Sequence, residues 1–194
     1  MNNHINSKLH NNKCHKPTSF TEEHKEAIFK TLNLQKGETF LDLGCGVGDY
    51  SLYAATISTK LKQIFAIDIN KDLLLDLEKT AKLLKIDNLT TKYSDINKDI
   101  NIETNSIDKC LIATVLHATN IFDTHSKFFS ELTRIMKDKG EIVILECKKE
   151  RTFFGPPFEK RIDPKTLEQH LQQYGFDKLE QINLNNFYLM KFRV

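Results

Sequence analysis

The chain has 194 residues, which is enough for one well-filled core and short for two. Its 28 Lys and Arg nearly balance its 26 Asp and Glu, and the net charge of +2 gives no general case for a nucleic-acid or membrane-surface partner. No apolar run of about 18 residues is present, so no membrane-spanning helix is expected, and residues 1–20 lack the apolar segment of a signal peptide. The four cysteines show no C-x-x-C spacing, which predicts free thiols in a cytoplasmic protein.

The first 18 residues are rich in Asn and His and contain no acidic residue. We expect this segment to be either a mobile tail or a lid that becomes ordered over a site. His10, Cys14 and His15 have the chemistry of metal ligands, but their spacing is not typical of a metal-binding motif. The sequence therefore predicts no metal site.

Strand and helix signals alternate from residue 19 onward and predict one domain over residues 19–194. Seven strands are expected, at 40–43, 64–69, 89–96, within 106–117, and at 141–147, 178–184 and 187–194. Helices are expected after residue 19 and over 49–59, 70–86, 121–137 and 164–174. Repeated strand–helix units indicate an α/β fold with a doubly wound, mostly parallel sheet and helices on both faces. Only two residues separate the last two strands, so these should form an antiparallel hairpin.

Several residues mark the expected element boundaries. Ser19 and Glu22 have the spacing of a capping box for the first helix, and Gly37 is expected to end that helix. Asn70 is expected to cap the helix over 70–86. Lys139 and Gly140 are expected to form the turn before strand 141–147.

The stretch FLDLGCGVGDY, residues 40–50, places glycines at 44, 46 and 48 directly after the first expected strand. Glycine at such a turn permits positive φ and lets a ligand approach bare backbone. A dinucleotide site of the form G-x-G-x-x-G would need its third glycine at position 49 or 51, where this chain has Asp49 and Ser51. The pattern is instead D-x-G-x-G-x-G.

That pattern, from Asp42 to Gly48, resembles the first motif of the class I S-adenosylmethionine-dependent methyltransferases. The resemblance covers roughly residues 20–194 and implies a Rossmann-like, three-layer α/β/α fold with a C-terminal antiparallel hairpin. More narrowly, Val115-Leu116-His117 and Gly155-Pro156-Pro157 with Arg161 are similar to small methyltransferases of the ubiquinone/menaquinone-biosynthesis type. The chain departs from that subgroup at Ala118 and Cys147, both on the expected acceptor side.

Acidic residues lie at the ends of three successive expected strands and are expected beside the cofactor. Asp42 would place a negative charge near the cationic ligand. Asp68, about 20 residues after the glycines, would accept from the ribose hydroxyls, or else serve only as a helix-entry residue beside Asn70. The resemblance implies that Asp95 accepts from the adenine amino group with Ile96 against the ring, a solvated loop aspartate being the alternative. The predicted cofactor contacts are Asp42, Gly44, Cys45, Gly46, Gly48, Asp68, Ile69, Asp95, Ile96 and Thr114.

The acceptor is expected beyond the fourth and fifth strands. His117 is predicted to be a general base or to orient the acceptor, a satisfied structural histidine being the alternative. Glu146 is the second candidate base, or else an exposed charge at a strand end. Arg161 is expected to contact the substrate from a loop, residues 148–162, that is rich in cations and phenylalanine.

The sequence thus predicts transfer of a methyl group from S-adenosyl-L-methionine to a small-molecule acceptor by in-line displacement. An NAD-dependent oxidoreductase is the first alternative, disfavoured by the missing third glycine. A protein that binds S-adenosylmethionine without transferring the methyl group is the second. The chain has no added basic domain, so no nucleic-acid partner is expected.

Overall fold

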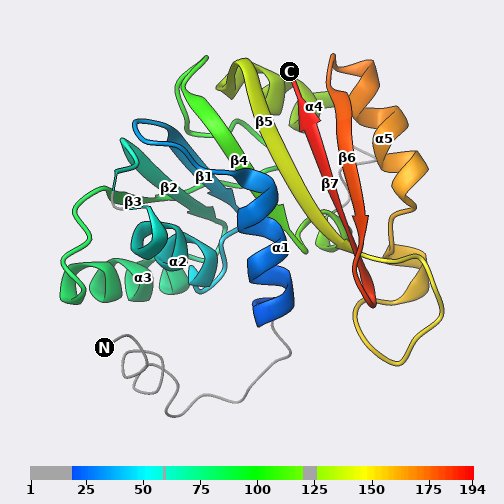
Figure 1. The fold of residues 1–194 in the computed structure, drawn as a ribbon, viewed down its shortest axis with the longest axis horizontal. Helices are drawn as coiled ribbons and strands as arrows, with labels where there is room; N and C mark the ends of the chain where they lie inside the picture. Colours follow the sequence, from blue (N-terminus) through cyan, green and yellow to red (C-terminus); the bar gives the residue numbers. More distant parts are fainter. Residues whose placement is uncertain (1–18, 59, 120–125) are drawn as a thin grey trace.

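The computed structural model describes residues 19–58, 60–119 and 126–194, so the expected N-terminal tail lies outside the described residues. Helices and strands alternate as the sequence predicts (Figure 1). The strands are β1 (Thr39–Leu43), β2 (Gln63–Asp68), β3 (Leu89–Tyr93), β4 (Ile107–Ala113), β5 (Met136–Cys147), β6 (Asp177–Asn183) and β7 (Phe187–Arg193). The helices are α1 (Glu22–Leu32), α2 (Asp49–Ile57), α3 (Lys71–Leu83), α4 (Ser126–Ile135) and α5 (Pro164–Gln173). Short 3-10 turns lie at Leu116–Ala118 and Phe158–Lys160.

The strands of the described residues form one seven-stranded sheet in the order β3-β2-β1-β4-β5-β7-β6. The pairs among β1 to β5 are parallel, whereas β7 is antiparallel to both of its neighbours, β5 and β6. The predicted doubly wound sheet with a C-terminal antiparallel hairpin is therefore confirmed. The hairpin places its second strand next to β5 and leaves β6 at the edge.

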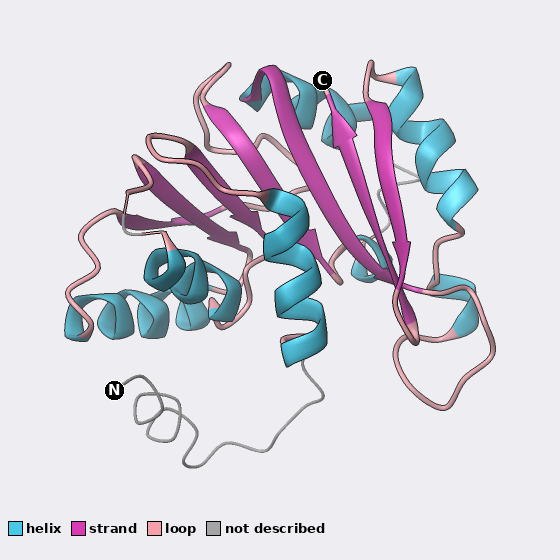
Figure 2. Ribbon diagram, in the orientation of Figure 1, coloured by secondary structure: helices cyan, strands magenta, loops and turns pink. Residues whose placement is uncertain are grey.

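Helices cover both faces of the sheet (Figure 2). Leu111 of β4 packs into a cluster with residues of α1 and α2, whereas its neighbour Ile112 packs into a cluster with residues of α4 and α5. This alternation follows from the two-residue period of a strand, and burial on both faces explains the continuous apolar runs of β4 and β5. The predicted three-layer arrangement is confirmed. No helix in the described ranges is both long enough and apolar enough to cross a membrane.

The ends of α1 differ from the prediction because other residues supply the capping groups. The N-cap is Thr21, whose side chain accepts from the backbone N–H of His24 at 3.2 Å. Ser19 instead offers its carbonyl oxygen to His24 Nδ1 at 2.8 Å. The helix ends at Leu32 with Asn33, in the left-handed conformation, as its C-cap, so the prediction that Gly37 ends it is wrong by several residues. The predicted cap of α3 is confirmed, since Asn70 accepts from the first turn of that helix.

The start of β5 also differs from the prediction. The strand begins at Met136, directly after α4, and Met136 pairs with Ile107 of β4. The register then shifts, and pairing resumes between Lys109 and Glu141. The expected turn at residues 139–140 is therefore an irregularity inside one long strand, with Lys139 at a φ of 63°.

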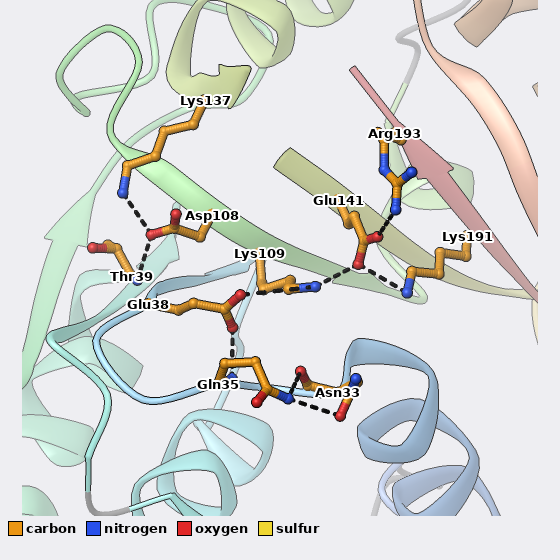
Figure 3. Close-up of polar contacts among 10 residues, drawn as sticks. All are labelled: Asn33, Gln35, Glu38, Thr39, Asp108, Lys109, Lys137, Glu141, Lys191 and Arg193. Atoms are coloured by element: carbon orange, nitrogen blue, oxygen red, sulfur yellow. Dashed lines mark hydrogen bonds and ion pairs between the residues drawn. The ribbon is translucent and has the colours of Figure 1, made fainter. Parts of the chain in front are cut away.

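Glu141 joins three strands at the edge where the parallel strands begin (Figure 3). Its buried carboxylate contacts Lys109 of β4, Lys191 of β7 at 2.8 Å and Arg193 of β7 at 2.6 Å. Burial alone would raise the pKa of Glu141, but the hydrogen bonds from these three cations outweigh it and lower the pKa to about 2. The folded protein therefore favours the charged form of this group.

The stability supplied by Glu141 should be present above the ordinary carboxyl pKa of 4.5 and be lost as the pH falls towards 2. Glu141→Gln should reduce the free energy of unfolding by about 1–3 kcal/mol at neutral pH and flatten its dependence on pH in that acidic window. Urea unfolding across the window measures both effects. Glu103→Gln, at an exposed carboxylate, is the matched control. Equal losses in the two variants would contradict the assignment.

Candidate active site

The candidate active site lies at the edge where the parallel strands end. β1 pairs with β2 on one side and with β4 on the other, so the order of the strands reverses between β1 and β4. Ligands of open α/β sheets bind beyond the strand ends at such a reversal. The ends of β1 and β2 form one half of the site, and the ends of β4 and β5 form the other.

The glycine loop, residues 44–48, leads from β1 into α2. Its three glycines have φ values of 79°, 55° and 83°, a conformation that costs other residues free energy. The backbone N–H groups of Gly44 and Cys45 both donate to the carbonyl oxygen of Ile67 in β2, at 2.7 and 2.9 Å. These bonds fix the loop against the end of the neighbouring strand.

The glycines at 44 and 46 serve different purposes. A Cβ atom on Gly44 would lie 2.4 Å from Cγ2 of Val115, so this glycine is required for packing against the end of β4. A Cβ atom on Gly46 would have no heavy atom within 4 Å. The backbone at Gly46 therefore faces open space that a ligand can enter.

Asp68, at the end of β2, lies beside that space. Its Oδ2 accepts from the backbone N–H of Gly46 and its Oδ1 from that of Asn70, each at 2.8 Å. A carboxylate has about four lone-pair sites, so both oxygens keep capacity to accept from a ligand hydroxyl. The next residue, Ile69, has 58% of its surface exposed and adds apolar area.

Asp42 is placed differently from the prediction. Only 1% of its surface is exposed, and its Oδ2 accepts from the Ser51 hydroxyl of α2 at 2.6 Å. Burial raises the pKa of Asp42 to about 7, against the lowering effect of the Ser51 hydrogen bonds. The side chain ties β1 to the first turn of α2, and this geometry does not support the predicted role as an acidic contact for a cationic ligand.

Three other residues predicted to contact the cofactor differ in their surroundings: Asp95 lies in a loop, and Ile96 and Cys45 are buried. Asp95 lies two residues beyond the end of β3, and its Oδ1 accepts from the backbone and side-chain amides of Asn97 at 3.0 and 3.1 Å. Ile96 is buried in the core on the α4 and α5 side. Cys45 packs against α3, and burial raises the pKa of its thiol. The packing assigns the side chains of Ile96 and Cys45 to the core.

The β4 turn, residues 114–118, connects the two halves of the site. Thr114 has a φ of 56°, which is unusual for a β-branched residue, and its backbone N–H donates to the Leu145 carbonyl at 2.8 Å. This positive φ turns the chain away from the direction of β4 and places the Val115 side chain against Gly44. The 3-10 turn that follows carries His117.

His117 and Glu146 form a hydrogen-bonded pair. His117 Nδ1 lies 2.7 Å from Glu146 Oε2, and the backbone N–H of Leu116 donates to Glu146 Oε1 at 2.8 Å. Glu146 is fully buried, so the alternative of an exposed strand-end charge is wrong. The structure thus brings both predicted catalytic residues together, and only the histidine retains some exposure.

Arg161 is not available for the predicted substrate contact. It is 4% exposed, and its five N–H groups donate within its own loop. The acceptors are the carbonyls of Pro156, Lys148, Glu150 and Phe154 and the hydroxyl of Thr152. The guanidinium therefore fixes the course of residues 148–157.

The sequence does not indicate the structural roles of Ser51 and Val115, although both residues lie in the stretches singled out above. Ser51 stands where a dinucleotide site would need its third glycine, and nothing in its spacing indicates a bond to Asp42. Val115 has the appearance of an ordinary apolar residue after a strand. Its contact with Gly44 depends on how β1 and β4 pair, and that pairing is a property of the whole sheet.

Gly44→Ala should destabilise the fold more than Gly37→Ala. Both positions have similar positive φ, so both variants carry left-handed strain of about 1–2 kcal/mol. Only at residue 44 does the new methyl group collide with a stiff β-branched side chain, which should cost about 1–3 kcal/mol more. Urea denaturation measures the difference. Equal costs would show that Val115 moves aside freely.

Arg161→Lys should loosen the loop over residues 148–157, because one ammonium cannot replace five N–H donors in a planar fork. Cleavage of this loop by trypsin should accelerate on the order of tenfold or more. Arg151→Lys is the control, since its guanidinium only lies over the Phe158 ring, at 4.8 Å. Both variants retain a tryptic site at the changed residue. Similar cleavage rates would contradict the role given to Arg161.

Comparison with known proteins shows that this chain is similar to methyltransferases. A family described as "Methyltransferase domain" matches residues 34–187. Demethylmenaquinone methyltransferase of Oceanobacillus iheyensis is 27% identical over 122 residues, covering 63% of this chain and 50% of that protein. The probable cobalt-precorrin-6B C(15)-methyltransferase (decarboxylating) of Methanosarcina acetivorans is 35% identical over 103 residues, covering 53% of this chain and 55% of that protein. The chain thus spans about half the length of these relatives.

Solved structures share the fold. A SAM dependent methyltransferase from Aquifex aeolicus superposes with a TM-score of 0.77 at 24% identity, covering 87% of this chain and 88% of that one. The family match covers well over half of the present chain and includes the glycine loop, the β4 turn and Glu146. The chain therefore belongs to the methyltransferase domain family, and it shares the fold of the class I methyltransferases.

Proposed function

We propose that this protein transfers a methyl group from S-adenosyl-L-methionine to a small-molecule acceptor by in-line displacement. The observation that carries the proposal is the open space at Gly46, beside the Asp68 carboxylate and at the reversal of strand order. The names of the relatives, which refer to demethylmenaquinone and cobalt-precorrin-6B, support a small organic acceptor.

The residues around this space suit the proposed cofactor. Asp68 offers acceptor capacity for ribose hydroxyls, Ile69 offers apolar surface, and Gly46 offers bare backbone. The glycine loop itself contains no basic side chain for a pyrophosphate, and it lacks the third glycine of a dinucleotide site. These features favour S-adenosylmethionine over NAD.

When bound, S-adenosylmethionine supplies an electrophilic methyl group on a leaving group that is already activated. The protein's own residues then have to align the acceptor and exclude water, and alignment alone can contribute about 7–11 kcal/mol. The acceptor half of the site would be the β4 turn and the end of β5. The contact between Val115 and Gly44 sets how closely the acceptor half lies to the cofactor half.

Calorimetric titration tests the cofactor site. The unaltered protein should bind S-adenosylmethionine and S-adenosylhomocysteine saturably and should not bind NADH. Gly46→Ala should weaken binding of the first two ligands by roughly tenfold or more, since its methyl group occupies the space given to the ligand. Gly37→Ala, at a glycine that also has positive φ and open surroundings but lies away from the site, should bind as the unaltered protein does.

Absence of S-adenosylmethionine binding in a folded sample, or binding of NADH alone, would contradict the proposal. Incubation with methyl-labelled cofactor and mixed small-molecule acceptors then tests transfer itself. Tight cofactor binding without label on any acceptor would favour a binding protein that has no transferase activity.

A further inference from the structure

The Glu146 carboxylate is fully buried and both of its oxygens are engaged by the β4 turn. Oε1 accepts from the backbone N–H groups of Leu116, at 2.8 Å, and His117, at 3.4 Å. Oε2 lies 2.7 Å from His117 Nδ1. The carboxylate has no exposed surface from which to reach a substrate proton. Glu146 can therefore act on the reaction only through His117.

These contacts determine which nitrogen of His117 carries the proton. Backbone N–H groups can only donate, so Oε1 is held as an acceptor, and Oε2 of the same carboxylate also accepts. His117 Nδ1 must then be the donor of its hydrogen bond. In the neutral ring this leaves Nε2 with a free lone pair. Among the described residues, the ring of His117 hydrogen-bonds through Nδ1 to Glu146, and its side chain keeps 17% exposure.

We infer that His117 Nε2 is the base that removes a proton from the acceptor atom, and that Glu146 is a positioning residue that fixes the tautomer of His117. The inference rests on the proposed methyl transfer and specifies the acceptor as a group whose nucleophilic atom bears a proton. A hydroxyl or thiol fits best, because it is a weak nucleophile until a base removes that proton. The nucleophilic atom loses its proton to Nε2 and gains the methyl group, whose bond to sulfur breaks with the electron pair remaining on sulfur. The resulting imidazolium donates from Nδ1 to Glu146.

An acceptor whose nucleophilic nitrogen bears no proton would make no use of this base. Under this inference Glu146 is not the second candidate base that the sequence suggested, but the residue that orients His117. The pair has the same division of tasks as the histidine and carboxylate of a serine-hydrolase triad, in which the carboxylate orients the ring and the ring moves the proton.

Glu146→Gln provides a sharp test because the new amide has only one orientation that satisfies the backbone. Its carbonyl oxygen should take the place of Oε1, where two N–H groups donate. Its NH₂ group then faces His117 Nδ1 and can only donate. The ring must respond by moving its proton to Nε2, which turns the base into a donor.

Nitrogen-15 NMR of the free protein in mildly alkaline solution reads the tautomer directly. In the unaltered protein His117 should carry its proton on Nδ1 and none on Nε2. In Glu146→Gln the proton should be on Nε2 and Nδ1 should be unprotonated. His117→Asn identifies the signals by their loss. His24 is the internal control, because its Nδ1 faces the Ser19 carbonyl at 2.8 Å and should keep its proton in both proteins.

A proton on Nε2 of His117 in the unaltered protein, or an unchanged tautomer in Glu146→Gln, would overturn the inference. Because no cofactor is needed, this result is independent of whether the protein binds S-adenosylmethionine. Failure of the proposed function would instead be seen as absent cofactor binding or absent transfer.

Labelled methyl transfer tests the acceptor class with catechol, 2-mercaptoethanol and nicotinamide as probes. Catechol or the thiol should be methylated by the unaltered protein, and Glu146→Gln should lower that rate by roughly 10²–10⁴-fold without changing cofactor affinity. Methylation of neither of these two, methylation of nicotinamide alone, or an equal rate in Glu146→Gln would each overturn the assignment.

Discussion

The close approach of the glycine loop and the β4 turn depends on the missing side chain at Gly44. Val115 occupies the volume that a Cβ atom at Gly44 would need, and the two segments follow adjacent strands of the sheet. The sheet alone would set the strand ends about 4.8 Å apart and leave their loops free to diverge. The contact with Val115 fixes the distance between the glycine loop and the β4 turn, and so between the two halves of the site.

Three charged residues near the site, Asp42, Glu146 and Arg161, hold parts of the chain in place. Asp42 is bound to Ser51, Glu146 to the β4 turn, and Arg161 to the loop after β5. Burying such groups is unfavourable unless they are paired, and each of them has partners. Asp68 and His117 differ because each keeps some exposure and some hydrogen-bonding capacity. The structure thus separates the residues that shape the site from those that can meet a ligand.

Much of the fold could be predicted from the sequence because its signals are local. Apolar periodicity located the helices and strands, Asn70 marked a helix start, and the two-residue spacing before β7 required an antiparallel hairpin. The predicted start of β5, at residue 141, was wrong. Lys139 and Gly140 have the composition of a turn, whereas pairing of Met136 with β4 extends the strand. Long-range pairing outweighed the local signal.

The candidate site was only partly predictable for the same reason. The glycine pattern, Asp68, and His117 and Glu146 as separate candidates were identified from residue types at strand ends, whereas the hydrogen bond between the last two was not. The side-chain partners were not, because Asp42 meets Ser51 and Arg161 meets Pro156 only through the course that the intervening loops take. A sequence shows that a charged residue follows a strand, but not whether its charge faces ligand or backbone.

The antiparallel direction of β7 has a practical consequence for work on this protein. The backbone N–H of Val194 donates to the Gly140 carbonyl at 3.1 Å, so the chain leaves the sheet beside Glu141, at the edge opposite the glycine loop (Figure 1). A fluorophore, affinity handle or surface tether joined after Val194 would start on that far side. Immobilised protein would then present its candidate site to the solution, which suits binding measurements on a sensor surface.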